Sequence, residues 1–84
     1  MNSKHRRTLA AIFKEPVSAS VAWTDIESLF VAIGSEVIEG SGSRVRFAKD
    51  GGVGTFHRPH PAKEAKRYQV RDARTYLTSI GVTP

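Results

Sequence analysis

Polar and apolar residues alternate along two short runs of the chain, residues 44–47 and 53–57. In the first run Val45 and Phe47 fall on one face and two arginines on the other, the period of two that is typical of a half-buried strand. The Lys-Asp-Gly-Gly sequence between the runs supplies residues that adopt positive φ in a tight hairpin turn. We therefore expect an antiparallel hairpin whose polar face presents Arg44, Arg46 and His57 together to solvent.

A helical period replaces this alternation over residues 24–33. Four apolar residues recur there at i, i+3, i+4 and i+7, which predicts a helix with one apolar stripe turned towards a core. Gly34 supplies the left-handed residue that ends a helix, and Thr24 and Glu27 have the spacing of a capping box at its start. The stripe consists of Ile26, Leu29, Phe30 and Ile33.

Further elements are expected on both sides of these two. The same helical spacing of apolar residues predicts a second strong helix over residues 66–80, and Gly81 follows it. A shorter helix is expected over residues 3–13 and an extended linker over residues 17–22. A strand over residues 35–39 precedes the hairpin.

The predicted elements follow one another as helix, helix, three strands and helix, which describes a small α+β domain. We expect an antiparallel sheet in sequential order, with the helices over residues 24–33 and 66–80 packed on one face. Trp23 is expected to pack over the start of its helix. The residues expected between the sheet and the helices are Ile26, Leu29, Phe30, Val37, Val45, Phe47, Phe56, Val70, Ala73 and Leu77.

The chain has 84 residues and no cysteine. This length is that of one domain, which buries only about 60–65% of its unfolded surface. Without cysteine there is no disulfide and no thiolate metal site. No apolar run approaches the ~20 residues of a membrane span. These features predict a cytoplasmic protein that does not enter a membrane.

Charge is unevenly distributed along the chain. Residues 1–39 hold four Lys or Arg against five Asp or Glu, a net charge of −1, whereas residues 40–84 hold nine against three, a net charge of +6. A basic surface of this kind on a small domain favours a polyanionic partner, most often a nucleic acid. A solvated face or an acidic protein partner would have the same signature.

Two of the three histidines, His57 and His60, lie in the basic part of the chain. Histidine takes up and releases protons near neutral pH, and arginine binds phosphate through paired donors. The combination predicts a site that binds a phosphate and moves a proton beside it. The sequence holds no carboxylate pair, metal-ligand cluster, P-loop or Ser/His/Asp arrangement, so we expect neither a metal nor a cofactor.

The order of the motifs from Thr24 to Val82 resembles that of the HicA-type toxins of bacterial toxin–antitoxin pairs. The shared pattern is a capped helix ending in glycine, a short strand, a Gly-Ser pair before the next strand, a glycine hairpin, a strand leading into a relative of Pro-x-His, then Lys-Glu and a basic helix ending in Ile-Gly-Val. Residues 1–22 would then be an N-terminal helical extension and linker, and residues 23–84 a HicA-like domain.

The resemblance implies a fold similar to double-stranded RNA-binding domains, metal-independent cleavage of single-stranded messenger RNA, and neutralisation by a HicB-type antitoxin. In the family the catalytic histidine directly follows Gly-Ser, whereas here Gly42 and Ser43 are followed by Arg44. Arginine stays charged and cannot serve as a general acid or base. His60 matches the second histidine of the family, and His57 is an addition. The scaffold and the place of the site therefore carry over, but the catalytic residue does not.

Three functions remain open from the sequence: a ribonuclease toxin, an RNA-binding module without catalysis, and a protein that only docks an acidic antitoxin. We expect the first, an endoribonuclease, with a catalytically degenerate RNA-binding or antitoxin-binding module as the alternative because of Arg44. The candidate catalytic residues are His57 and His60, and the candidate RNA- and phosphate-binding residues are Ser43, Arg44, Arg46, Arg58, Lys63, Arg71 and Arg74.

Overall fold

The computed structural model describes residues 1–84 as three helices and one antiparallel sheet with the strand order β1-β2-β3. The α+β class and the predicted order of elements are confirmed. None of the helices is long and apolar enough to span a membrane. The elements are α1 (Ser3–Phe13), α2 (Trp23–Ala32), β1 (Glu36–Glu39), β2 (Arg44–Lys49), β3 (Gly52–His57) and α3 (Arg67–Ser79).

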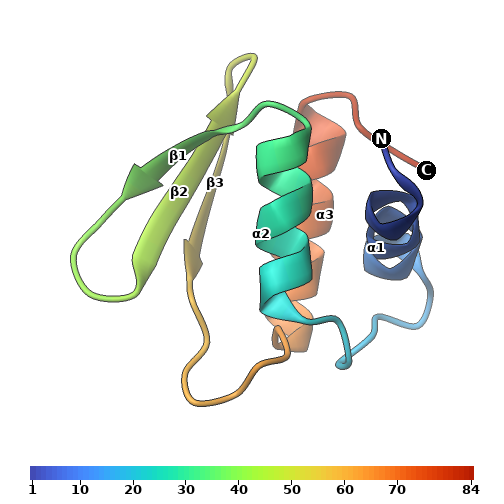
Figure 1. Ribbon diagram of the computed structural model, residues 1–84, viewed down its shortest axis with the longest axis horizontal. Helices are drawn as coiled ribbons and strands as arrows, with labels where there is room; N and C mark the ends of the chain where they lie inside the picture. Colours follow the sequence, from blue (N-terminus) through green and yellow to red (C-terminus); the bar gives the residue numbers. More distant parts are fainter.

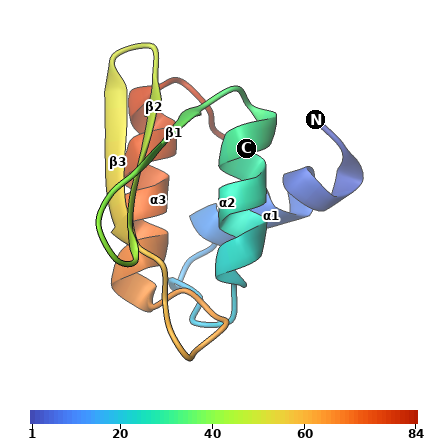
Figure 2. The ribbon, with the colours of Figure 1, turned by 60° about the vertical axis from the view of Figure 1, so that its left-hand side comes forward.

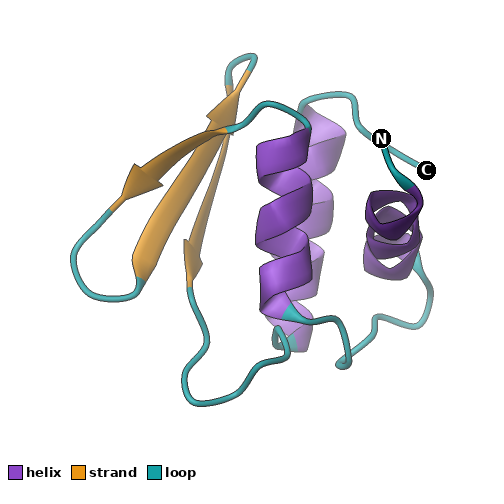
Figure 3. Ribbon diagram, viewed as in Figure 1, coloured by secondary structure: helices purple, strands orange, loops and turns teal.

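The elements form layers (Figure 1). α2 and α3 lie together over one face of the sheet, and α1 packs against both of them on the side away from the sheet. The other face of the sheet is uncovered, as the view coloured by secondary structure also shows (Figure 3). The prediction that the helices pack on one face is therefore confirmed, and the polar face of the hairpin is the uncovered one.

The turn between β2 and β3 fixes the register of the hairpin. Asp50 and Gly51 both have positive φ, 50° and 84°, as a two-residue turn with the twist of a hairpin requires. Lys49 consequently pairs with Gly52, and the pairing continues to Arg44 and His57 at the far end. The predicted hairpin is confirmed in its turn and in the phase of both strands.

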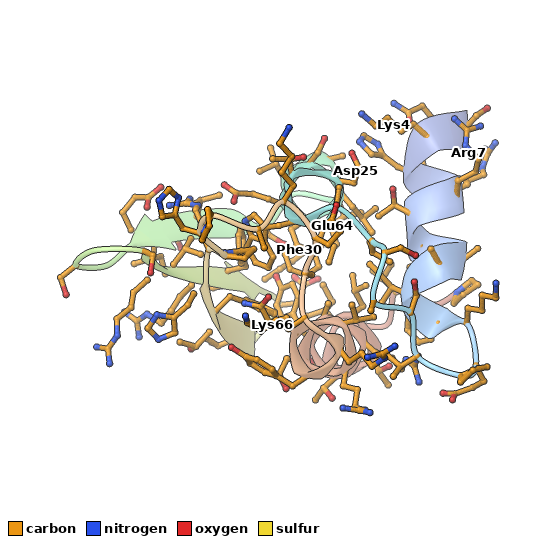
Figure 4. The ribbon with its side chains drawn as sticks, turned by 90° about the horizontal axis from the view of Figure 1, so that it is seen from below. Lys4, Arg7, Asp25, Phe30, Glu64 and Lys66 are labelled. Carbon is orange, nitrogen blue, oxygen red and sulfur yellow. The ribbon has the colours of Figure 1, made fainter.

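Phe30 is the centre of an aromatic core between the sheet and the helices (Figure 4). Its ring centroid lies 4.9 Å from that of Phe47 on β2 and 4.9 Å from that of Tyr76 on α3, both in edge-to-face geometry. Trp23 is buried against Phe56, with centroids 5.3 Å apart. The predicted core residues that are buried are Ile26, Leu29, Phe30, Val45, Phe47, Phe56, Val70, Ala73 and Leu77.

Val37 was predicted in this core, and that prediction is wrong. Val37 pairs with Phe47 and so lies on the helix-facing side of the sheet, yet 36% of its surface is exposed. The reason is its place in β1, a four-residue edge strand that the helices shield only in part.

The predicted capping box at α2 is also wrong. The helix begins at Trp23, and its N-cap residue Ala22 has no side-chain capping bond. The backbone N–H of Trp23 instead donates to the carbonyl oxygen of Lys63, at 2.9 Å. Glu27 accepts a 2.9 Å hydrogen bond from the indole Nε1 of Trp23 and therefore does not cap the backbone.

The N-terminal segment belongs to the same core as the rest of the chain. Leu9 and Ile12 of α1 are buried in the cluster that contains Phe30. The linker after α1 runs antiparallel to the segment before α3, where the N–H of Ala65 donates to the carbonyl of Val21 at 2.8 Å. α1 is thus fixed to the domain at its apolar face and through its connection.

Candidate nucleic-acid interface

The β2–β3 hairpin brings Arg44 and His57 together on the uncovered face of the sheet. The two are register partners, and Arg46 pairs with Thr55 one pair further along that face. Partners in an antiparallel ladder project to the same side, with their Cβ atoms about 4.5–5.5 Å apart. All four side chains are exposed, while the alternate residues of both strands are buried. The hairpin therefore presents two cations and one imidazole side by side.

A groove of about 480 Å³ opens over this face, next to the turn between β1 and β2. It gathers residues from all three strands and is lined by polar and charged side chains for the most part. Thr55 and Ile38 contribute to it beside the two arginines and the histidine. The lining residues are Ile38, Glu39, Gly40, Ser41, Arg44, Val45, Arg46, Thr55 and His57.

The β1–β2 turn closes tightly around Arg44. The N–H of Gly40 donates to the carbonyl of Arg44 at 2.9 Å, and a Cβ on Gly40 would lie only 2.9 Å from the Cβ of Arg44. The turn also brings the hydroxyl of Ser43 to 3.5 Å from Nδ1 of His57, at the long end of the hydrogen-bonding range. Ser43 is thus the fourth predicted site residue in this group.

Arg58, the residue after β3, is bound on both sides by carboxylates. Its Nε and Nη2 donate to the two oxygens of Glu27 on α2, at 3.0 and 2.9 Å. Its Nη1 and Nη2 donate to the two oxygens of Glu39 on β1, at 2.7 and 3.0 Å. The guanidinium donors of Arg58 are therefore engaged within the protein. The phosphate-binding role predicted for this residue remains a prediction.

These bonds shift the proton affinities of the three groups. The hydrogen bonds from Arg58 lower the pKa of Glu27 despite its partial burial, and the bond from Trp23 lowers it further. Arg58 likewise lowers the pKa of Glu39. The two carboxylates, Glu39 more than Glu27, raise the pKa of Arg58. The cluster is fully ionised at neutral pH and holds the chain just after His57.

Arg74 is not part of the hairpin group. It lies on α3 and binds the end of α1, donating from Nε and Nη2 to the carbonyl of Ile12 at 3.0 and 2.9 Å. It also pairs with Glu15 and lies over the ring of Phe13, 5.8 Å from its centroid. Its interactions join two helices, and its predicted contact with RNA remains a prediction.

The remaining predicted residues lie beyond the hairpin. His60 and Lys63 are exposed in the loop between β3 and α3, and Arg71 is exposed on α3. Neither Lys63 nor Arg71 takes part in an ion pair. The structure therefore gathers Ser43, Arg44, Arg46 and His57, and leaves the other predicted residues outside this group.

Gln69 was not singled out in the sequence, although it ties α3 to the site. Its side chain is buried, and Nε2 donates to the carbonyl of His57 at 2.6 Å while Oε1 accepts from the N–H of Lys66 at 3.0 Å. The sequence signal for this role was a polar residue next to the apolar stripe of the helix. An amide buried at such a position needs hydrogen-bond partners for both its oxygen and its nitrogen.

Comparison with known families decides what kind of protein carries this hairpin. Residues 23–82 match the family model described as the HicA toxin of bacterial toxin–antitoxin systems. The chain belongs to the HicA toxin family. Neither the curated proteins nor the solved structures gave a match.

Membership of the HicA family implies a cognate antitoxin as a partner. The match includes the hairpin, the Arg58 cluster and α3, but it leaves α1 and the linker after it outside. In this HicA-family chain α1 nevertheless supplies two residues to the common core, as described above.

Proposed function

We propose that this HicA-family protein is an endoribonuclease that cleaves messenger RNA in the cytoplasm, and that a HicB-type antitoxin neutralises it. The observation that supports this best is the pairing of Arg44 with His57 on the uncovered face of the hairpin, with Arg46 on the same face. Two guanidinium groups can hold a phosphate there beside an imidazole that can exchange a proton.

In the proposed reaction the ribose 2′-oxygen attacks the adjacent phosphorus, and the bond from phosphorus to the 5′-oxygen breaks. His57 takes the proton of the 2′-hydroxyl as general base. His60 gives a proton to the departing 5′-oxygen, so that a 2′,3′-cyclic phosphate and a 5′-hydroxyl are formed. Arg44 and Arg46 stabilise the negative charge that builds up on the phosphate oxygens. No step uses a metal ion.

The other exposed cations support the choice of RNA as substrate. Lys63 and Arg71 have no carboxylate partner, and we assign them to phosphates further along the strand. The antitoxin would cover the same basic surface with acidic groups, which would exclude RNA.

A second candidate function, binding of RNA without cleavage, is favoured by one residue. Arg44 stands where the resemblance implies the catalytic histidine, and its side chain cannot exchange a proton. Proton transfer contributes roughly 10²- to 10⁴-fold to a reaction of this kind. If His57 does not supply it, the protein is a binder with little nuclease activity.

The deciding experiment incubates single-stranded RNA with the wild type and four variants in the presence of a metal chelator, and follows cleavage and growth arrest. His57→Ala and His60→Ala should lower the cleavage rate by roughly 10²-fold or more each. His5→Ala, at the half-buried histidine of α1, is the matched control and should cleave like the wild type. The fourth variant is Arg44→His.

Two results would decide against the nuclease proposal. If the wild type is inert and Arg44→His cleaves RNA, the protein is a binding module in which Arg44 has replaced the catalytic group. If the wild type cleaves RNA but neither His57→Ala nor His60→Ala slows it, the proposed proton transfers are wrong.

A further inference from the structure

Tyr68 is an aromatic residue without a structural role. The other large aromatic side chains, those of Trp23, Tyr76 and the four phenylalanines, are buried in the core or pack against it, whereas Tyr68 on the first turn of α3 is 52% exposed. Its hydroxyl makes no hydrogen bond and its ring pairs with no other ring. Tyrosine, which combines an apolar ring with a polar hydroxyl, is enriched at binding interfaces.

α3 runs antiparallel to β3 and beside it (Figure 2). The two elements approach so closely that a Cβ on Gly52 would lie 2.6 Å from the hydroxyl oxygen of Ser79, near the end of α3. At the other end, the buried amide of Gln69 donates to the carbonyl of His57. The first turn of α3 is therefore fixed at the end of β3 that carries His57.

Tyr68 lies on the flank of α3 that borders β3. Residues 68, 72, 75 and 79 follow at i, i+4, i+7 and i+11, so they share one side of the helix. Ser79 marks that side as the one next to β3. β3 is an edge strand, so no further strand lies beyond it on this side of the sheet.

The surroundings of Tyr68 are strongly basic. Lys66, Arg67 and Arg71 lie within one helical turn of it, and none of them is in an ion pair. Asp72, four residues further along the same side, is the one carboxylate of this stretch of the helix. The ring is therefore placed among cations that attract a phosphate backbone.

We propose that Tyr68 is a stacking site for an unpaired RNA base. The strand held at Arg44 and His57 would pass over the free edge of β3, and a neighbouring nucleotide would place its base on the Tyr68 ring. Only an unpaired base exposes a face for such stacking, so this site selects single-stranded over duplex RNA. The inference rests on the proposed function and adds a substrate requirement to it.

The test measures the affinity of a catalytically silenced form, His57→Ala, for a short single-stranded RNA, with and without further substitutions at Tyr68. Tyr68→Ala should weaken binding by about 5- to 140-fold, from the energy of stacking one base. Tyr68→Phe keeps the ring and should bind like the parent. Thr75→Ala, exposed on the same side of α3, is the matched control and should also bind like the parent.

A second ligand, an abasic RNA, distinguishes base stacking from phosphate binding. An abasic RNA of the same length keeps the phosphates, so the parent and Tyr68→Ala should bind it equally. The slope of affinity against salt concentration should also be the same for both, since no phosphate contact is lost. Duplex RNA should not distinguish the two proteins either.

Several outcomes would overturn the inference. Equal affinities of the parent and Tyr68→Ala for the normal strand would do so, and so would an equal loss on normal and abasic strands. If these results came with RNA cleavage by the wild type, the stacking site alone would be wrong. If no RNA of any kind bound to the parent or the wild type, both the stacking site and the proposed function would be wrong.

Discussion

The guanidinium of Arg58 faces the carboxylate of Glu27 in a bidentate arrangement, with Nε–Oε1 and Nη2–Oε2 distances of 3.0 and 2.9 Å. Both side chains are more than two-thirds buried, so the pair is less screened than a surface ion pair. Arg58→Ala should lower the free energy of unfolding by about 1.5–3 kcal/mol, since it leaves Glu27 with one partner. Urea denaturation at pH 7 measures this loss.

The same pair should respond to acid. The pKa of Glu27 is lower in the folded protein than the value of about 4.3 in an unfolded chain. Its contribution to stability is therefore complete above that value and disappears as the pH falls through the lower folded pKa. The difference between the wild type and Arg58→Ala should shrink as the pH falls below about 4. A difference that stays constant over this range would show that the ion pair is not its source.

Salt dependence should separate the hairpin arginines from Arg74. Arg44→Ala and Arg46→Ala should each reduce the slope of log affinity for single-stranded RNA against log salt by about 0.7, because each removes one phosphate contact. Arg74→Ala should leave the slope unchanged, since its donors bind α1. A reduced slope for Arg74→Ala, or unchanged slopes for both hairpin variants, would contradict the interface described here.

Truncation within α1 should destabilise the whole domain. Ile12 is completely buried in the common core, so Ile12→Ala should cost about 2–5 kcal/mol in a denaturant melt. Arg6→Ala, exposed on the same helix, is the control and should change stability by less than about 0.5 kcal/mol. A loss below about 1 kcal/mol for Ile12→Ala would show that α1 packs only loosely.

Gly54 allows α3 to approach the sheet, and the approach should not tolerate a methyl group. A Cβ at this position would lie 2.8 Å from Cε1 of Phe56 and 3.1 Å from the side chain of Tyr76, both in the core. Gly54→Ala should therefore cost about 1–3 kcal/mol through overpacking. Val53→Ala, at an exposed neighbour, should have little effect. Equal stabilities of Gly54→Ala and the wild type would mean that α3 can move away from β3 without loss.

The hairpin and the two central helices could be predicted because local patterns determine them. Alternation gave the phase of Val45 and Phe47, and the residues at the turn, Asp50 and Gly51, set the register that brings Arg44 opposite His57. Both depend only on neighbours in the chain. The polar face of the candidate site followed from this phase alone.

Side-chain partners could not be predicted, because tertiary packing chooses them. Glu27 had the spacing of a capping residue, but Trp23 and Arg58 lie close enough in space to take both of its oxygens. Arg58 and Arg74 look like the other cations in sequence, and only the positions of Glu39 and of the end of α1 distinguish them. The free cations are those that no carboxylate or carbonyl happens to reach.

Residues on the uncovered face of the sheet are under different evolutionary constraints from the residues that alternate with them. Arg44 is exposed and contributes nothing to the core, so exchanging it for histidine, or the reverse, changes no buried contact. Residues that alternate with it, such as Val45, are constrained by folding instead. A lineage with this fold can therefore gain or lose an active group at position 44 in one step while the core of the protein stays the same. Toxicity can then change in evolution without a period of misfolding.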